Sequence, residues 1–378
     1  MTQNHMVNNF IHKVGSHCES SAMRDMFEFY GFPMSEPMAF GLDGTMGFAY
    51  FDSSTRTAGS EPSDMIFFIG GKQDTITPNS LACRLLGITL RKQSFTSADK
   101  AWKESKKFLS QDIPLLIQVD LGFLTYFDEE EDLHFGGHAI TLAGYDEEKG
   151  IAYVGDTEFK GFQEVLIEDL KKARNSKHGP KFLHPNNTQY SMQRRVDGKH
   201  PPFAAGVKLA IQKVVNHMLR PSMNNIGIQG FKRFANAILN WNETLKGQVI
   251  NPYNGKEESS ARLTFELIHG YIETWGTGGA SFRNLYKSFL EELLDHPELK
   301  EGQRTWKTDE LNILKASIPH ISASAQKWTL LAETLKNAAD EYKSECLKYV
   351  NLDELHNLTL EMLSEEEQLF KKLSKIKI

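Results

Sequence analysis

The stretch Gly15-Ser16-His17-Cys18-Glu19-Ser20-Ser21-Ala22 places a cysteine at the start of a predicted helix. Apolar residues recur at helical spacings from Met23 to Tyr30, and Gly31 ends the helix. Ser16 is the predicted N-cap, so Cys18 would lie near the positive end of the helix dipole, where the thiolate is favoured. A lone cysteine in this position is more often a buried structural residue, so its role depends on the rest of the chain.

The length and composition of the chain limit its class. A chain of 378 residues is long enough for two domains. Its 40% hydrophobic and 24% charged residues are typical of a soluble globular protein. A net charge of −6 without a basic stripe argues against nucleic acid as a partner. No signal peptide and no apolar stretch of transmembrane length are visible, so we expect a cytoplasmic protein with no membrane partner.

The three cysteines are Cys18, Cys83 and Cys346. An odd and sparse set fits a reducing compartment with free thiols better than a disulfide framework. Cys83 and Cys346 have apolar neighbours and are predicted to lie in the core. No residues have the spacing of a structural zinc site, and the acidic run Asp128–Asp132 is most simply a solvated loop. We therefore expect neither a metal nor another cofactor.

Strands and helices alternate in the first part of the chain. Apolar runs predict strands there, at Met65–Ile69, Ile88–Phe95 and Ile113–Val119. A further strand begins at His138, directly after Gly136-Gly137, and its hairpin partner Ile151–Val154 ends at Gly155-Asp156. Residues 1–176 are therefore predicted to form an α+β domain with a mostly antiparallel sheet.

The remainder of the chain has a different pattern. Residues 177–202 are rich in proline, histidine, asparagine and lysine, and are predicted to be a linker. Residues 203–378 are predicted to form a mainly α-helical domain, with helices at about 203–218, 229–245, 257–275, 282–294, 308–317, 322–349 and 352–373. The segment Gly276–Ala280 lacks the preceding strand and following lysine of a phosphate loop. Arg283 follows it and is a candidate for positioning an anionic substrate group.

A catalytic cysteine needs a histidine that holds it as an ion pair, a group that orients the histidine, and donors for the oxyanion. One order found in papain-like folds is a cysteine on the first helix, then a histidine and an Asp or Asn on adjacent strands. The chain offers this order in Cys18, His138 and Asp156. The predicted hairpin would bring the last two together, because the start of one strand lies beside the end of the next. Gly137 would leave room for a thioester or peptide backbone.

Other residues compete for these roles. The rivals for the base and for the orienting group are His12, His134 and Glu158. His17 is adjacent to Cys18 and stays a candidate for substrate or oxyanion binding, although adjacent residues at a helix start point apart. The serines around Cys18 lack the Gly-x-Ser-x-Gly elbow of a serine nucleophile.

Several blocks resemble the family of butirosin biosynthesis protein H: Gly15–Ala22, Ser35-Glu-Pro-Met-Ala-Phe-Gly41, Gly47-Phe-Ala-Tyr50 and Gly137-His138. The segment Thr274–Tyr286 resembles the helical domain, of the DUF4872 type, that follows in that family. The resemblance covers nearly the whole chain. It implies a papain-like, cysteine-peptidase-type fold for the N-terminal domain, and acyl transfer as the activity.

The named member of that family moves an aminoacyl group from a carrier-protein thioester to an amine of an aminoglycoside. By resemblance, Cys18 would be the acylated nucleophile, His138 the base and acid, and Asp156 the orienting group. A related peptidase group has an oxyanion glutamine six residues before its cysteine. His12 holds that position here, so it is a candidate oxyanion donor beside the backbone N–H of Cys18.

We therefore expect a cysteine-dependent acyltransferase of specialised-metabolite biosynthesis. Its donor would be an acyl carrier protein or another acyl thioester, and its acceptor a small-molecule amine. The alternatives are a hydrolase of the same fold (peptidase, amidase or thioesterase) and a non-catalytic binding protein with a degenerate site. The sequence leaves open the acyl group, the acceptor and the oligomeric state, a homo-oligomer included.

Overall fold

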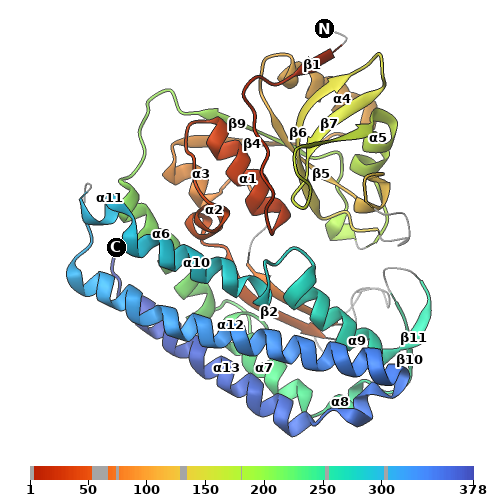
Figure 1. Cartoon of the computed structure of the whole chain (residues 1–378), viewed down its shortest axis with the longest axis vertical. Coiled ribbons are helices and arrows are strands. Elements are labelled where there is room, and N and C mark those ends of the chain that lie inside the picture. The colour runs from red at the N-terminus through yellow and green to blue at the C-terminus, as the bar shows by residue number, and fades with distance from the viewer. Residues whose placement is uncertain are drawn as a thin grey trace. The chain divides into compact units, whose positions relative to one another are not determined.

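The structure is a computed structural model that describes residues 4–52, 67–73, 76–127, 134–179, 181–251, 255–301 and 305–378. The chain divides into two compact units, Met1–Ala39 with Ile76–His200 and Phe40–Thr75 with Pro201–Ile378 (Figure 1). It therefore enters the second unit and returns to the first before residue 76. The predicted domain boundaries at residues 176 and 203 do not assign residues 40–75 to the second unit. The acidic run 128–132, and the start of the strand predicted at 65–69, lie outside the described residues.

The first unit is built on a seven-stranded sheet. The order along it is β4-β9-β5-β6-β7-β8, and β1 also pairs with β6. The strands are β1 (Asn4–Met6), β4 (Ile88–Gln93), β5 (Leu115–Val119), β6 (His138–Asp146), β7 (Ile151–Gly155), β8 (Phe162–Leu166) and β9 (Gln189–Arg194). All of these pairings are antiparallel, which confirms the prediction of an α+β domain with an antiparallel sheet.

The strand β6, which begins at His138, lies inside the sheet and is buried along its whole length. Helices α1 (Cys18–Phe29) and α4 (Ala98–Leu109) pack against β5 and β6. Helix α5 (Ile167–Asn175) packs against β5, β7 and β8, and the short α3 (Leu81–Leu85) packs beside β4. Because α1 packs directly on β6, the first residue of the helix and the first residue of the strand belong to one close-packed body.

The predicted linker at 177–202 is partly wrong, because it contains β9, which pairs with both β4 and β5. The strand is not recognisable in the sequence, because polar residues interrupt the apolar pattern of a buried strand. Gln189 is fully buried, and its side-chain oxygen accepts hydrogen bonds from Ser105 (2.7 Å) and Arg174 (3.1 Å). A buried amide with two such donors replaces the apolar residue that the strand pattern requires.

The second unit is mainly α-helical, as predicted. Its helices include α6 (Phe203–Leu219), α7 (Gly227–Ile238), α8 (Trp241–Thr244), α9 (Ser260–His269), α10 (Arg283–Asp295), α11 (Pro297–Lys300), α12 (Thr308–Tyr342) and α13 (Leu352–Leu373). In Figure 1, α12 and α13 run side by side. The two helices predicted at 308–317 and 322–349 are wrong as a pair: α12 continues through Pro319 and is followed by a 3-10 helix from Lys343.

Two pairs of antiparallel strands also belong to this unit, and the second pair corrects the expectation that no strand follows residue 202. They are β2 (Met46–Asp52) with β3 (Phe67–Lys72), and β10 (Gln248–Ile250) with β11 (Glu257–Ser259). On β2, the ring of Phe48 stacks on Phe231 of α7 at 4.7 Å, and Phe231 stacks on Trp328 of α12 at 5.0 Å. Strand β2 therefore belongs with the helices, because its aromatic side chain Phe48 completes the helical core.

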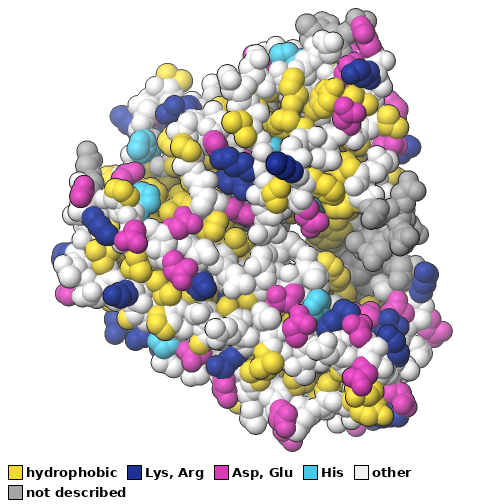
Figure 2. Space-filling model, viewed as in Figure 1, with side chains coloured by type: hydrophobic (Ala, Val, Ile, Leu, Met, Phe, Trp, Pro, Cys, Tyr) yellow, Lys and Arg dark blue, Asp and Glu magenta, His cyan; other side chains and the backbone are white. Residues whose placement is uncertain are grey.

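Charged side chains of both signs are interspersed over the face drawn in Figure 2. Among the described residues on that face, no large patch of Lys and Arg gathers over neighbouring elements. Within the described part of the chain, no helix combines the length and the apolar character that a membrane span requires.

Candidate active site

Cys18 is the first residue of α1, as the sequence predicts, but the N-cap is His17 and not Ser16. The His17 backbone is extended, and its Nδ1 accepts a hydrogen bond from the backbone N–H of Ser20 at 3.2 Å. An imidazole nitrogen thus takes the role that a serine hydroxyl usually has at a helix start. The side chain of His17 holds the turn that presents Cys18.

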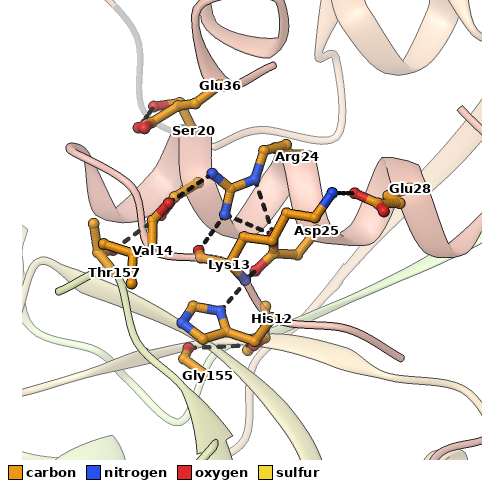
Figure 3. A network of polar contacts seen from close by, with 12 residues as sticks. His12, Lys13, Val14, Ser20, Arg24, Asp25, Glu28, Glu36, Gly155 and Thr157 are labelled. Carbon is orange, nitrogen blue, oxygen red and sulfur yellow. Dashed lines mark hydrogen bonds and ion pairs between the residues drawn. The ribbon is translucent and has the colours of Figure 1, made fainter. Parts of the chain in front are cut away.

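Glu36, the first residue of α2 (Glu36–Asp43), binds the same turn. Its buried carboxylate accepts hydrogen bonds from the backbone N–H groups of Ser16 (2.7 Å) and His17 (2.8 Å), and from the hydroxyl of Ser20 (2.8 Å). Figure 3 shows Glu36 next to Ser20 at the start of the helix. A carboxylate there satisfies donors that the helix cannot pair and interacts favourably with its dipole. No pattern in the sequence indicates this role of Glu36.

Gly15 allows the turn to pack tightly. A Cβ atom at this position would lie 2.4 Å from the Cβ of Ser21 and 2.9 Å from Oε2 of Glu36. Both distances are far below van der Waals contact, so any side chain would displace the turn.

The hairpin of β6 and β7 brings His138 and Asp156 together. Thr141 is opposite Gly155 in the register, so the residue after β7 lies beside the start of β6. The Nε2 atom of His138 is 2.8 Å from Oδ1 and 2.9 Å from Oδ2 of Asp156, and both side chains are buried. The proximity that the sequence predicts for these two residues is therefore present.

The carboxylate of Asp156 has two further donors. The hydroxyl of Tyr126 donates at 2.7 Å, and the backbone N–H of Thr157 donates at 2.7 Å. Burial alone would raise the pKa of Asp156, but the charge of His138 and these hydrogen bonds together lower it below its ordinary value. Asp156 is thus held as an ion in a buried position, and Tyr126 is a site residue that the sequence did not indicate.

Cys18 completes the group. Burial of the imidazole would lower the pKa of His138, but the charge and hydrogen bond of Asp156, followed by those of Cys18, raise it to about 10. Because Asp156 holds Nε2, the ring nitrogen that can face the thiol is Nδ1. An imidazolium in this position would favour the thiolate of Cys18, and this is the arrangement that a cysteine nucleophile requires.

Two contacts tie the segment after β7 to the cysteine turn. The backbone N–H of Gly15 donates to the carbonyl oxygen of Thr157 at 2.8 Å, and the hydroxyls of Ser21 and Thr157 are 2.9 Å apart. One contact is made before Cys18 in the sequence and the other after it. Together they fix the position of Cys18 relative to Asp156, the residue before Thr157.

His12 does not have the position expected for an oxyanion donor. Its Nδ1 is 2.7 Å from the carboxylate of Asp25, and its Nε2 is 2.9 Å from the carbonyl oxygen of Asp156 and 3.0 Å from that of Phe159. Figure 3 shows the ring directed at Asp25. Both ring nitrogens are engaged, so the prediction of His12 as an oxyanion donor is wrong.

Arg283 is also wrongly assigned. Its guanidinium is fully buried in the second unit, where it forms a two-pronged ion pair with Glu366 (2.8 and 3.0 Å) and donates to the carbonyl oxygen of Ser281. The ring of Trp328 lies against it, 5.1 Å away. A guanidinium with these partners is part of a core and cannot position a substrate that enters from solvent.

The glycines before His138 have a structural explanation. A Cβ atom on Gly136 would lie 2.6 Å from the carbonyl oxygen of Leu183, and one on Gly137 would lie 2.8 Å from the ring of Phe135. The ring of Phe135 fills the space beside Gly137. This contact explains why a glycine stands there, without the predicted role of Gly137 in substrate binding.

The remaining rivals lie elsewhere. His134 pairs with the buried carboxylate of Asp120 at 3.0 Å, and Glu158 is exposed. Cys83 and Cys346 are buried, as predicted. Within the described residues, no group of three or more potential ligands is arranged to hold a metal ion.

An aromatic cluster borders the imidazole. The ring of Phe127 meets His138 edge-on at 6.2 Å, and Phe127, Tyr126 and Phe159 contact one another at 5.0 to 5.2 Å. These rings limit the access of water to the ion pair of His138 and Asp156, which strengthens the electrostatic interaction between them.

Comparison with known families gives two matches. The N-terminal region of butirosin biosynthesis protein H matches residues 17–157, and a domain of unknown function, DUF4872, matches residues 168–373. The first match begins at His17 and ends at Thr157, so it includes Cys18, His138 and Asp156 and leaves out His12. No curated protein matches the chain.

Proposed function

The chain belongs to the family of butirosin biosynthesis protein H, and we propose that it is an acyltransferase that moves an acyl group from a thioester to an amine. The family matches bear out the resemblance in the sequence blocks, and the family is named for a biosynthesis protein. The observation that carries the proposal is the buried pair of His138 and Asp156 beside Cys18 at the start of α1.

In the first half-reaction, the thiolate of Cys18 attacks the carbonyl carbon of an acyl thioester, on a carrier protein or a small thiol. The negative charge moves to the carbonyl oxygen, and the backbone N–H of Cys18 in the first turn of α1 is a donor for it. When the intermediate collapses, the carbon–sulfur bond to the donor breaks. His138 gives its proton to the departing thiolate, which leaves an acyl-Cys18 thioester and a neutral imidazole.

In the second half-reaction, the amine attacks the carbonyl carbon of acyl-Cys18. His138 accepts the proton that the nitrogen loses as the amide bond forms, and the thiolate of Cys18 leaves. The ion pair of thiolate and imidazolium is thereby restored, with an amide as the only product of this step. Asp156 keeps the imidazole in one orientation and stabilises its protonated form throughout.

The aromatic cluster favours an amine over water as the acceptor. Phe127 borders the imidazole that must receive the proton, Phe159 packs on Phe127, and together these rings restrict the solvent around the imidazole. A hydrolase of the same fold would use the same three residues, so the acceptor must be tested directly.

The test is intact-protein mass spectrometry after incubation with a panel of acyl and aminoacyl N-acetylcysteamine thioesters. We expect a mass adduct on Cys18 that added primary amines remove as an amide, and no adduct in Cys18→Ala. An equal adduct in Cys18→Ala would contradict the nucleophile. Release only as free acid, at every amine concentration, would establish a hydrolase instead. A panel that leaves both proteins unmodified would argue for a binding protein with a degenerate site.

A further inference from the structure

His12 contacts the backbone of Asp156, the residue that orients the proposed base His138. The Nε2 atom of His12 contacts two carbonyl oxygens, those of Asp156 (2.9 Å) and Phe159 (3.0 Å). These two oxygens flank a tight turn, because the backbone N–H of Phe159 donates to the carbonyl of Asp156 at 3.0 Å. The ring also packs directly on the backbone: a Cβ atom at Gly155 would lie 2.7 Å from Cγ of His12. The end of β7 is therefore shaped to receive this imidazole.

The hydrogen-bond partners define the protonation state of His12. Carbonyl oxygens can only accept, so Nε2 carries a proton. On the other side, Nδ1 faces the carboxylate of Asp25, which also accepts two hydrogen bonds from the guanidinium of Arg24 at 2.9 and 2.7 Å. A carboxylate also accepts, so Nδ1 carries a proton as well, and His12 is an imidazolium.

The electrostatics agree with this assignment. Burial alone would lower the pKa of His12, but Asp25 and the two backbone carbonyls together raise it above its ordinary value. The side chains of His12 and Asp25 are 2% and 0% exposed, so the pair is screened little by solvent. A charge-assisted hydrogen bond at 2.7 Å in such a place is strong and directional.

Asp25 links this pair to the nucleophile. It lies on α1, seven residues after Cys18, and the helix is continuous between them. A chain of contacts therefore runs from the carbonyl of Asp156 through His12 and Asp25 to the helix that begins with Cys18. Figure 3 shows this network of His12, Arg24 and Asp25 between the helix and the strand end at Gly155.

We propose that His12 is a positioning residue, whose ion pair with Asp25 holds the Asp156 turn in register with α1 and so aligns Asp156, His138 and Cys18. The proposal rests on the proposed function, in which these three residues act together. It explains why a histidine, with two donors in opposite directions, stands at this position. A glutamine could not reach both the carboxylate and the two carbonyls with the same rigid geometry.

The test compares His12→Ala and His12→Gln with a matched control, His134→Ala. The control also removes a histidine that pairs with a buried aspartate in the same unit, since Nδ1 of His134 lies 3.0 Å from the carboxylate of Asp120. Three quantities are measured for each protein: the melting temperature, the pKa of His138 by NMR of labelled histidine, and the rate of Cys18 alkylation by iodoacetamide at about pH 6.

In His12→Ala we expect alkylation of Cys18 to slow by about tenfold to a hundredfold, because a small misplacement of a catalytic group has effects of this size. The pKa of His138 should fall, since its carboxylate partner is no longer held. His12→Gln keeps one donor for the carbonyls and should retain an intermediate rate. It also serves as the folded variant if the alanine protein does not fold. His134→Ala should change the melting temperature alone.

The outcomes separate the two claims. If Cys18 of the unaltered protein alkylates no faster than a free thiol, the proposed function fails. If that rate is enhanced but both His12 variants keep the rate and the His138 pKa of the parent, His12 has a purely structural role and the inference is overturned.

Discussion

Asp156→Asn is the substitution that most sharply tests the electrostatics of the site. It removes the charge of Asp156 and keeps the size of the side chain. In the folded protein, Asp156 and Cys18 raise the pKa of His138 from 6.5 to about 10 against the opposing effect of burial. That difference corresponds to roughly 5 kcal/mol in favour of the imidazolium. With the carboxylate gone, Cys18 alone opposes the effect of burial, and the pKa of His138 should fall well below 10.

The assay is an NMR titration of protein labelled at the Cε1 carbons of histidine, with the resonance of His138 assigned from its absence in His138→Gln. In the parent protein this resonance should stay at its protonated position between about pH 5 and 9. In Asp156→Asn it should titrate in that range. A variant whose His138 pKa equals that of the parent would refute the reasoning, because the carboxylate would then contribute nothing to the charged imidazole.

The same substitution changes how stability depends on pH. A histidine with a higher pKa in the folded than in the unfolded protein stabilises the fold fully below pH 6.5, and this contribution is lost as the pH rises to about 10. Urea denaturation of the parent should therefore show a loss on the order of 5 kcal/mol across that window. Asp156→Asn should show a flatter dependence there, and an equally steep one would contradict the coupling.

Three further predictions test the surroundings. Gly15→Ala forces a methyl group into the cysteine turn and should cost about 1–3 kcal/mol in urea denaturation and slow alkylation; an unchanged protein would show that the turn can relax. Tyr126→Phe removes one donor to Asp156 and should raise the pKa of that carboxyl, measured by NMR, with no change taken as a contradiction. Glu366→Ala strands the charge of Arg283 and should cost about 3–5 kcal/mol, measured by thermal or urea unfolding, while a loss below about 1 kcal/mol would refute the buried pair.

The parts of the site that the sequence predicts correctly are local. The turn before α1 places Cys18 at the start of the helix, and the pairing of β6 with β7 places Asp156 beside His138. Chain order and hairpin pairing therefore suffice to bring His138 and Asp156 together, and the α+β class follows from the same alternation of strands and helices.

The parts that the sequence does not predict depend on contacts between distant side chains. Glu36 binds the turn across 20 residues, and Arg283 meets Glu366 across 83. No periodicity indicates which acid will meet which donor, so Arg283 looks available in the sequence although it is fully buried. The strand β9 also depends on distant contacts, since its partners on β4 lie about a hundred residues earlier.

His12 shows how a position can be identified correctly and its role wrongly. The resemblance singles out the residue six positions before Cys18, and this residue does lie next to the site, because it contacts the backbone of Asp156. Its ring contacts the backbone of Asp156 instead of the space around the thiol. The direction of a side chain at the end of an extended segment is set by its partners, here Asp25 and two carbonyls, and these are known only from the fold.

The central claim is that Cys18 is held as a thiolate by His138 and Asp156. Its most direct test is the rate at which iodoacetamide alkylates Cys18 at about pH 6, followed by intact mass and compared with glutathione. The other two cysteines are buried and should stay unmodified. Because a free thiol is almost fully protonated at this pH, we predict that Cys18 reacts roughly a hundredfold faster. A Cys18 that reacts no faster than glutathione would contradict the account.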